Sequence, residues 1–511
     1  MSNPLHDALL APHRESAATF LRRLDGGELT YGAFYANVLR TARALESLGL
    51  SPGDRLAMQV EKSVEALEIY GACMASGVIF LPLNTAYTTD EIGYFLSDAT
   101  PRVFVCDPAW ASRPTPVAGE EQTKVLTLSG EGEGSFADVV ATMPAEFTPA
   151  DRDGGDIAAL LYTSGTTGRS KGAMLTQANL LSNAEVLTEL WRITSDDTLL
   201  HALPIFHAHG LFVAVNTTLL SGAGMIYLPG FKADAVIDAL PRATTMMGVP
   251  TFYTRLLADT RFDAGLLANM RLFISGSAPL LAETHEAFEA RTGHRILERY
   301  GMTETGMNTS NPYDGERRAG TVGFPLPGVE VRIMGEGSDT EVPDGEIGMI
   351  EVRGPNVFKG YWGMPDKTAE DLRENGFLIT GDLGRRDADG YIHIVGRNKD
   401  LIISGGYNVY PKEVELVLDE QPGVLESAVI GVRHPDFGEG VVAVLVPKSG
   451  EDIDVSTVRA GIAAKLAKYK QPKEAIVIDA LPRNAMGKVQ KNVLREQFAD
   501  LFEEQPAARS G

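Results

Sequence analysis

Glycines, hydroxyl side chains and two cations are concentrated between residues 163 and 172, in the stretch TSGTTGRSKG. Glycines let the backbone approach an anion closely, hydroxyl and N–H groups donate hydrogen bonds, and Arg169 and Lys171 add positive charge. The spacing differs from a Walker A motif, because the fifth residue after Gly165 is Ser170. We therefore predict a phosphate-binding loop other than a P-loop, with a polar surface loop as the alternative. The residues expected to hold phosphate are Thr163, Ser164, Gly165, Thr166, Thr167, Gly168 and Lys171.

A second chemically dense stretch, ERYGMTETG, covers residues 298–306. Tyr300 can stack on a planar base, Thr303 can donate to a phosphate, and Glu304 can hold Mg²⁺ against phosphate oxygens. A helix end followed by a polar loop would look similar. Further along, Asp382 follows the apolar residues 377–379. It could accept both hydroxyls of a ribose, and an Asp-capped turn explains it equally well.

Two histidines, His207 and His209, flank Ala208 in the stretch HALPIFHAHG. No cysteine or acidic residue stands at metal-ligand spacing, so a zinc site is not indicated. We interpret the stretch as the lining of a pocket, and a core histidine with satisfied hydrogen bonds is the alternative. Arg255 is the lone cation on the helix expected from residue 251. The backbone of residues 276–278 could read the edge of a planar ring.

Helices and short apolar strands alternate through the first part of the chain. Helical spacing over 29–48 and 63–76 is followed by strand-length apolar runs at 55–60 and 77–83, and a further run covers 102–106. This alternation predicts a layered α/β architecture with mainly parallel sheets.

The phosphate-loop stretch lies between an apolar run at 157–162 and helical spacing over 176–190. We therefore expect a strand-to-helix turn at this place. Residues 119–150 are rich in Glu, Gly, Thr and Pro and carry little periodic signal, so we expect loops there.

The length of 511 residues exceeds the roughly 250–300 residues at which a single core stops growing. A hairpin signal at Asp389–Gly390 is followed by a break in the pattern at residues 396–400. We predict a large N-terminal domain over 1–396, a hinge over 397–400 and a small mobile α/β domain over 401–511. Within this last segment Lys488 follows a glycine in a loop, where a solvated lysine is the alternative to a functional one.

The formal net charge of -22 opposes nonspecific binding to nucleic acid or to anionic lipid, since both need an extended basic face. Cys73 and Cys106 have apolar neighbours and are interpreted as buried reduced thiols, with an unproven pair as the alternative. The longest uncharged apolar tract, 69–83, is shorter than the ~20 residues that span a bilayer. We see no secretory signal and expect a cytoplasmic protein.

Together these stretches resemble the adenylate-forming family of acyl-CoA synthetases, firefly luciferases and nonribosomal peptide synthetase adenylation domains. The resemblance covers nearly the whole chain, because five motifs occur in order, at residues 163–172, 300–304, 380–383, 396–400 and 482–488. It implies that a carboxylic acid attacks the α-phosphate of ATP to give an acyl-adenylate and pyrophosphate. The thiol of coenzyme A then displaces AMP. The expected cofactors and co-substrates are ATP, Mg²⁺ and CoA.

The resemblance implies a role for each matched residue. Lys488 would neutralise the carboxylate and the α-phosphate, Lys399 would be the hinge, and Gly405 and Gly406 would line a pantetheine tunnel. The catalytic candidates are Lys488, Thr303, Glu304 and His207. Glu304 and, more weakly, Thr167 would hold Mg²⁺. The expected nucleotide-binding residues outside the phosphate loop are Gly276, Ser277, Ala278, Glu298, Tyr300, Gly301, Met302, Asp382 and Arg397.

The acid-binding stretches look most similar to the malonyl-CoA synthetase branch of this family. In that branch a cation meets the second carboxylate, and Arg255 is our candidate because guanidinium binds carboxylate bidentately. A packing or salt-bridge role for Arg255 is the alternative. Ser277, His207 and Met307 would complete the pocket. We expect threonine between the two histidines in this branch, so Ala208 would loosen the pocket and weaken the exclusion of methylmalonate.

Three functions remain open at this point. The first is ligation of malonate or a small 2-substituted malonate to CoA, and another short- or medium-chain acid is its variant. The second is an adenylation enzyme that loads a carrier protein, and the third is a nucleotide-binding regulator without turnover. Acylation of Lys488 by an acyltransferase, reversed by a deacylase, would remove its charge and act as an off-switch.

Overall fold

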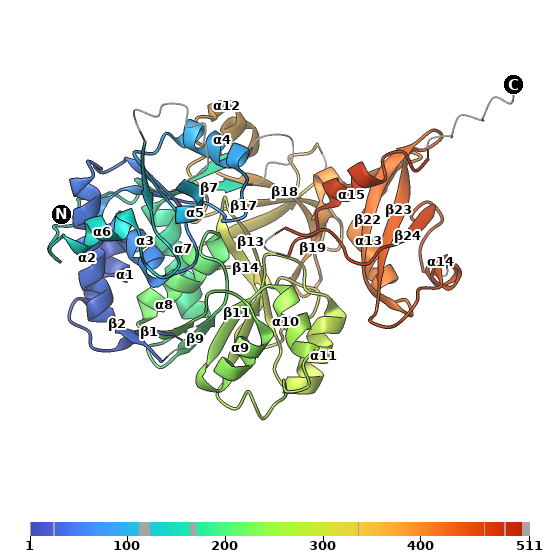
Figure 1. Ribbon diagram of the computed structural model, residues 1–511. Coiled ribbons are helices and arrows are strands. Elements are labelled where there is room, and N and C mark those ends of the chain that lie inside the picture. Colours follow the sequence, from blue (N-terminus) through green and yellow to red (C-terminus); the bar gives the residue numbers. More distant parts are fainter. Residues whose placement is uncertain are drawn as a thin grey trace, which may run out of the picture. The chain divides into compact units, whose positions relative to one another are not determined.

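The computed structural model describes residues 2–23, 26–111, 123–163, 170–335, 337–463, 465–484 and 487–502 of the chain (Figure 1). The chain divides into two compact units. Unit 1 comprises Met1–Val331 and Val352–Leu378, and unit 2 comprises Arg332–Glu351 and Ile379–Gly511. The hinge expected at 397–400 lies within unit 2 and stays a prediction. The mixed α/β architecture, with a large N-terminal part and a smaller C-terminal part, is as expected.

A six-stranded sheet in unit 1 has the strand order β6-β5-β3-β4-β7-β8. All neighbouring strands are parallel except β7 and β8. The strands are β3 (Arg55–Gln59), β4 (Ile79–Pro82), β5 (Val103–Cys106), β6 (Lys124–Thr127), β7 (Ile157–Thr163) and β8 (Lys171–Thr176). Helix α2 (Tyr31–Ser47) precedes β3, and the helices between the strands are α3 (Val64–Ser76), α4 (Thr89–Ala99), α5 (Pro108–Ala111) and α6 (Ser135–Ala141). The mainly parallel sheet confirms the expectation from alternation.

A nine-stranded sheet in unit 1 has the order β15-β14-β13-β12-β11-β9-β10-β1-β2. Its strands from β1 to β13 in this order are parallel, and the edge strands β2, β14 and β15 are antiparallel. The strands are β1 (Thr19–Arg22), β2 (Glu28–Thr30), β9 (Thr198–His201), β10 (Gly224–Tyr227), β11 (Thr245–Gly248), β12 (Leu272–Ser275), β13 (Leu297–Met302), β14 (Gly306–Ser310) and β15 (Phe324–Pro325).

Helices cover this sheet through a shared apolar core. The helices α9 (Ala233–Ala239), α10 (Pro250–Leu257) and α11 (Ala282–Thr292) lie beside β11 (Figure 1). Their buried side chains, such as Val236, Tyr253 and Phe288, pack with Met246 of β11 and Phe273 of β12. The remaining helices of unit 1 are α1 (Pro4–Leu9), η1 (Ala11–His13), α7 (Gln177–Leu190), η2 (His209–Val215), α8 (Asn216–Ser221), η3 (Leu240–Arg242) and α12 (Pro365–Asp371).

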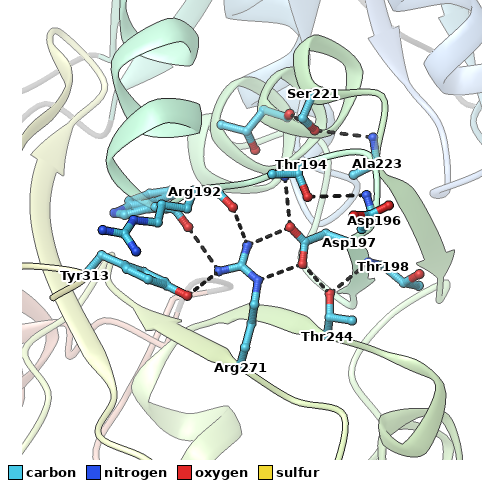
Figure 2. A network of polar contacts seen from close by, with 12 residues as sticks. Arg192, Thr194, Asp196, Asp197, Thr198, Ser221, Ala223, Thr244, Arg271 and Tyr313 are labelled. Carbon is cyan, nitrogen blue, oxygen red and sulfur yellow. Dashed lines mark hydrogen bonds and ion pairs between the residues drawn. The ribbon is translucent and has the colours of Figure 1, made fainter.

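A polar network holds the amino-terminal ends of three neighbouring strands of this sheet, β9, β11 and β12 (Figure 2). Asp197, Thr244 and Arg271 directly precede these strands. Arg271 donates to both carboxylate oxygens of Asp197 at 2.8 and 2.6 Å, to the Tyr313 hydroxyl at 3.1 Å and to the Arg192 carbonyl at 2.8 Å. Thr244 donates to Asp197 at 2.6 Å. The well-satisfied Arg271 at this edge is a structural ion-pair residue.

Unit 2 carries a four-stranded sheet, β16-β17-β18-β19, and a second sheet in which β21, β20, β23 and β22 follow one another and β24 joins β23. Apolar residues cover both faces of the β22–β23 pair, as in an independent small domain. The elements are β16 (Glu330–Met334), β17 (Gly348–Arg353), β18 (Leu378–Arg386), β19 (Ile392–Arg397), η4 (Asn398–Asp400), β20 (Ile402–Ser404), β21 (Tyr407–Val409), α13 (Pro411–Asp419), β22 (Val424–His434), β23 (Gly438–Pro447), α14 (Val455–Ala463), β24 (Glu474–Val477) and α15 (Lys491–Gln497).

Two expectations from the sequence are wrong in detail. The phosphate-loop stretch joins two antiparallel strands, β7 and β8, rather than a strand and a helix, because residues 171–176 form β8 before α7 begins. The segment 119–150, expected to be loops, contains β6 and α6. Both elements are short, and their weak periodicity hid them. The apolar tract 69–83 is buried core, as expected, and Cys73 and Cys106 are buried free thiols. Among the described residues, no helix has the length and apolar composition to cross a bilayer.

Candidate active site

The carboxyl ends of the parallel strands of the nine-stranded sheet carry the candidate acid-binding residues. Ligands of open α/β sheets bind at this edge. His201 ends β9, and the chain then runs into η2, a π-helix of residues His209–Val215. π-Helical turns are rare and occur frequently at functional sites. Ser277 follows β12 and has a φ of 71°, a conformation that costs a non-glycine residue energy.

His209 joins two residues that the sequence assigns to the acid pocket. Its backbone N–H donates to His207 Nδ1 at 3.3 Å, and its own Nδ1 lies 3.2 Å from Ser277 Oγ. The His209 side chain is fully buried, and this burial, together with the nearby Arg299 charge, holds its pKa well below the usual value. His209 is therefore neutral at pH 7 and acts as a hydrogen-bonding group.

Arg299 is a buried cation that the sequence reasoning missed. Its side chain is 3% exposed, and its guanidinium packs on Gly276, where an added Cβ would lie 2.4 Å from Arg299 Cζ. Burial lowers its pKa to about 9, while Tyr253 and Glu298 act in the opposite direction. Within the described part of the chain, Arg299 Nε and Nη2 have no hydrogen-bond acceptor. The sequence did contain a signal for this residue, because an arginine within a strand-length segment is seldom fully buried without a partner.

Other buried polar atoms near this edge share that condition. His209 Nε2 and Ser275 Oγ also have no hydrogen-bond partner among the residues that the structure describes. Buried donors are normally satisfied, so unsatisfied ones need an explanation. Arg271 at the opposite edge of the same sheet, by contrast, has several hydrogen-bond acceptors.

Arg255 and Met307, the other acid-pocket candidates, lie in different surroundings. Arg255 is exposed on α10, with its Cζ 6.0 Å from the centre of the Phe231 ring. Met307 is 3% exposed, and an added Cβ at Gly301 would lie 2.7 Å from its Cε. The Met307 side chain therefore lies over the glycine that follows Tyr300, and glycine is needed there.

Ala208 and Thr303 line one small cavity of about 10 Å³, roughly the room for one water molecule. Phe212, Gly306 and Asn356 also line it. The cavity brings the residue between the two histidines next to the stretch expected to contact phosphate. Ala208 leaves this space unfilled.

Two of the phosphate-binding candidates, Thr163 and Lys171, lie opposite each other at the end of the β7–β8 ladder. Lys171 Nζ lies 3.5 Å from Asp371 Oδ2 and 4.1 Å from the centre of the Tyr361 ring. Within the loop itself, Ser164, Gly165, Thr166, Thr167 and Gly168 fall outside the described residues.

Glu304 is a buried carboxylate, 6% exposed, in the turn between β13 and β14. The Tyr361 hydroxyl donates to its Oε1 at 3.1 Å, and the Phe358 N–H donates to its backbone carbonyl at 2.8 Å. Tyr361, which the sequence reasoning did not identify, thus contacts both Glu304 and Lys171. Among the described residues no group of three or more metal-ligating side chains occurs. A single carboxylate still fits Mg²⁺, because this ion takes one or two carboxylates together with substrate phosphates.

The remaining nucleotide-binding candidates of unit 1 lie on or beside β12 and β13. Glu298 is buried and its Oε1 accepts from the Leu280 N–H at 3.1 Å. Tyr300 is half-buried on the same strand. Gly276, Ser277 and Ala278 form the turn after β12, in which Ser277 has the strained backbone described above. The residues of this group are Gly276, Ser277, Ala278, Glu298, Tyr300, Gly301 and Met302.

In unit 2, Asp382 and Arg397 form an ion pair across the β18–β19 ladder, with Arg397 Nε 2.7 Å from Asp382 Oδ1. Lys488 is exposed in the loop before α15, and its backbone N–H donates to Asn484 Oδ1 at 2.9 Å. Partial removal from water and the positive charge of Arg397 lower the pKa of Lys488, while Asp382 raises it. The charges of Asp382 and Arg397 therefore both influence the pKa of the Lys488 amine.

Gly405 and Gly406 form the tip of the β20–β21 hairpin, with φ values of 60° and 82°. Two consecutive positive φ angles are typical of the tight turns that glycine favours. An added Cβ at Gly405 would lie 3.2 Å from Phe437 Cδ1. A side chain at this tip would therefore meet both backbone strain and an aromatic ring. Lys399 lies in η4, where burial lowers its pKa.

Comparison with known proteins places this geometry in a family. Residues 10–362 match the AMP-binding enzyme family and residues 413–488 match the AMP-binding enzyme C-terminal domain. The crystal structure of ATP-bound MatB from Rhodopseudomonas palustris is similar, with a TM-score of 0.96 and 53% identity over 98% of this chain and 100% of that chain.

Two curated relatives cover nearly the whole chain. Feruloyl-CoA synthase from an Amycolatopsis species is 39% identical over 97% of this chain and 98% of its own length. Malonate–CoA ligase from Arabidopsis thaliana is 33% identical over 93% of this chain and 86% of its own length. The chain belongs to the AMP-binding enzyme family and is an adenylate-forming acid–CoA ligase.

Proposed function

We propose that this ligase joins malonate, or a small 2-substituted malonate, to coenzyme A. The acid oxygen attacks the α-phosphorus of ATP and pyrophosphate leaves. The thiol sulfur of CoA then attacks the acyl carbon, and AMP leaves with the carboxylate oxygen. Relatives named for malonate and for ferulate have similar identity to the chain, so the choice of acid depends on the pocket itself.

The single observation that carries the choice of malonate is Arg299. A buried guanidinium whose Nε and Nη2 have no hydrogen-bond acceptor among the described residues is costly unless a ligand supplies acceptors. A dicarboxylate supplies them, because the carboxylate that does not react can bind the guanidinium bidentately. His209 Nε2, with no hydrogen-bond partner within the described ranges, adds a second donor without adding charge. A ferulate side chain ends in a neutral phenol and offers no second anion.

Arg255 remains a second candidate cation for this carboxylate. Its exposure on α10 favours a role at the entrance of the pocket over a role in the buried charge pair. Exposed ion pairs contribute little, typically about 0–1 kcal/mol, whereas stranding one member of a buried pair costs about 3–5 kcal/mol. We therefore expect Arg299 to contribute more to dicarboxylate selectivity than Arg255.

The test is a panel of malonate, methylmalonate, acetate, propionate and ferulate assayed by pyrophosphate release. Arg299→Met should lower kcat/KM for malonate by a factor of about 100 or more, and for acetate by much less. Arg299→Lys keeps a charge and should retain part of the malonate activity. Arg255→Leu, which removes the exposed second candidate, should lower malonate activity by much less than Arg299→Met. Equal loss for every acid in Arg299→Met, or ferulate as the preferred acid of the wild type, would overturn the proposal.

Chemistry at the acyl-phosphate centre is proposed for residues of both units. Lys488 would neutralise the two anions that meet in the first half-reaction, and Asp382 with Arg397 would hold the ribose. Glu304 would hold Mg²⁺, which offsets phosphate charge when bound. Swivelling at Lys399 would then withdraw Lys488 and bring Gly405 to the thiol path. Tyr361 contacts both Lys171 of the proposed phosphate-binding hairpin and the Glu304 carboxylate.

Loading of a carrier protein is the alternative function. It shares the first half-reaction and differs only in the thiol. AMP release that requires CoA, and occurs without any carrier protein, supports the CoA ligase. AMP release only with a phosphopantetheinylated carrier protein would favour the alternative.

A further inference from the structure

Lys62 is a buried amine that neither half-reaction uses. It lies between β3 and α3, directly before Ser63, the N-cap residue of α3. Its Nζ is 2.7 Å from His201 Nδ1, 2.9 Å from the His201 carbonyl oxygen, and 4.3 Å from the centre of the Tyr227 ring. Burial holds the pKa of Lys62 well below its usual value. The side chain therefore joins the six-stranded sheet to the end of β9 through hydrogen bonds.

Both ring nitrogens of His201 are engaged, and this determines its tautomer. His201 is 1% exposed, and its Nε2 lies 2.7 Å from the Gly210 carbonyl oxygen. A carbonyl oxygen only accepts, so Nε2 carries the hydrogen and Nδ1 accepts from Lys62. Burial and the charge of Lys62 hold the His201 pKa well below its usual value, so the neutral ring persists at pH 7.

The hydrogen bond to the Gly210 carbonyl connects His201 to the π-helix η2. Gly210 is the second residue of η2, and an added Cβ there would lie 2.0 Å from the Pro204 carbonyl oxygen. The backbone of the first turn is thus held between Pro204 on one side and His201 on the other. The preceding residue of this turn is His209, whose ring contacts Ser277 Oγ.

We propose that Lys62 is a positioning residue for the acid pocket, acting through the relay Lys62–His201–Gly210 on the turn that carries His207 and His209. Lys62 does not touch the substrate in this account. Its hydrogen bond to Nδ1 holds the His201 ring in place, and His201 in turn holds the carbonyl of Gly210 and the orientation of His209 towards Ser277. The proposal rests on the assignment of this turn to the acid pocket.

The relay predicts a selective effect on the acid. Lys62→Met keeps the stem but removes the hydrogen bond to His201 Nδ1, so the His201 ring that donates to the Gly210 carbonyl is held by one contact fewer. We expect KM for the acid to rise about tenfold, equivalent to one lost hydrogen bond of about 1.4 kcal/mol, while KM for ATP stays within about twofold. His201→Leu should do the same, and the double variant should be no worse than either single one, because both changes break one relay.

The matched control is Tyr31→Phe. It removes a buried hydroxyl of unit 1 that lies 2.9 and 2.7 Å from the Thr218 and Ala223 carbonyl oxygens and takes no part in the relay. It should lower Tm without changing either KM. Lys62→Gln, which keeps an amide donor, should restore part of the acid KM and serves as the variant to measure where Lys62→Met does not fold.

Two outcomes would overturn the relay: an unchanged acid KM in Lys62→Met, or a parallel rise of the acid and ATP KM values. The measurement uses whichever acid the wild type prefers in the panel above. A preference for an acid other than a malonate would refute the proposed substrate. The relay would then be tested by the KM of that other acid, with the same two outcomes against it.

Discussion

Tyr361 donates its hydroxyl hydrogen to Glu304 Oε1 at 3.1 Å. The centre of the same ring lies 4.1 Å from Lys171 Nζ. The Tyr361 side chain therefore contacts both Glu304, the carboxylate proposed to hold Mg²⁺, and Lys171, the cation of the proposed phosphate-binding hairpin. Burial and the Glu304 carboxylate raise the pKa of the Tyr361 hydroxyl, so it stays a donor at all physiological pH values.

Tyr361→Phe should impair the first half-reaction through Glu304. Loss of a hydrogen bond to a charged group costs about 1.5–3 kcal/mol, so we expect pyrophosphate release to fall about tenfold or more and to need more Mg²⁺. A titration of Mg²⁺ at saturating ATP and acid measures this. Tyr87→Phe, a change in a ring that packs on Phe95, is the control. An unchanged Mg²⁺ dependence would contradict the role of Tyr361.

Lys488→Ala should separate the two half-reactions. Without the amine, two anions meet uncompensated, so adenylate formation should be lost while thioester formation from supplied malonyl-adenylate continues. Pyrophosphate release and acyl-CoA formation are measured separately. Lys465→Ala, which breaks a surface pair with Glu420 in the same unit, should affect neither step. If both half-reactions fall alike in Lys488→Ala, the account of two conformations is wrong.

The lowered pKa of Lys488 gives a pH dependence with a definite sign. The amine is charged below its pKa, and its surroundings place that pKa below the usual 10.5. Adenylate formation should therefore decline as pH rises, with a midpoint below 10.5. Lys488→Arg keeps its charge throughout and should lose this alkaline limb, whatever its absolute rate. A limb that persists unchanged in Lys488→Arg would assign the titration to another group.

The Asp197–Arg271 pair should stabilise the fold in a pH-dependent way (Figure 2). Burial alone would raise the pKa of Asp197, but hydrogen bonds from Arg271 and Thr244 lower it overall. A lowered folded-state pKa contributes stability above the unfolded value of about 3.9, and this contribution is lost as pH falls through the folded value.

Arg271→Met should strand the buried carboxylate and lower the free energy of unfolding by about 3 kcal/mol at pH 7. The difference from wild type should shrink below about pH 4, because the carboxylate is then protonated in the unfolded chain. Denaturant unfolding at several pH values measures both effects. Arg261→Met, which removes an exposed cation from Asp259, is the control. A difference that does not vary with pH would refute the electrostatic explanation.

Ala208→Thr should sharpen the choice between malonate and methylmalonate. The added methyl and hydroxyl would occupy the space that Ala208 leaves beside Thr303. We expect kcat/KM for methylmalonate to fall by a factor of about 10 relative to malonate, the usual range for one methyl group in a pocket. Competition between the two acids measures the ratio. An unchanged ratio of the two kcat/KM values would show that the 2-substituent does not occupy the cavity beside Ala208.

Local sequence was sufficient for the architecture and for the family. Strand-length apolar runs and helical spacing predicted the alternating elements, because a helix or strand with one buried face repeats that face in its own sequence. The glycine- and hydroxyl-rich stretch at 163–172 and the stretch at 298–306 were recognisable because their spacing is local. The short strand β8 was not predicted, because its six residues directly precede a helix and resemble the start of that helix.

Only the tertiary structure decided which cation is buried and which groups contact one another. Arg255 and Arg299 both stand near apolar residues in the sequence, yet one is exposed on α10 and the other lies beneath Gly276. The Lys62–His201 and Glu304–Tyr361 contacts join positions far apart in the chain. Sequence spacing carries no information on such contacts, because the packing of separate strands and helices determines them.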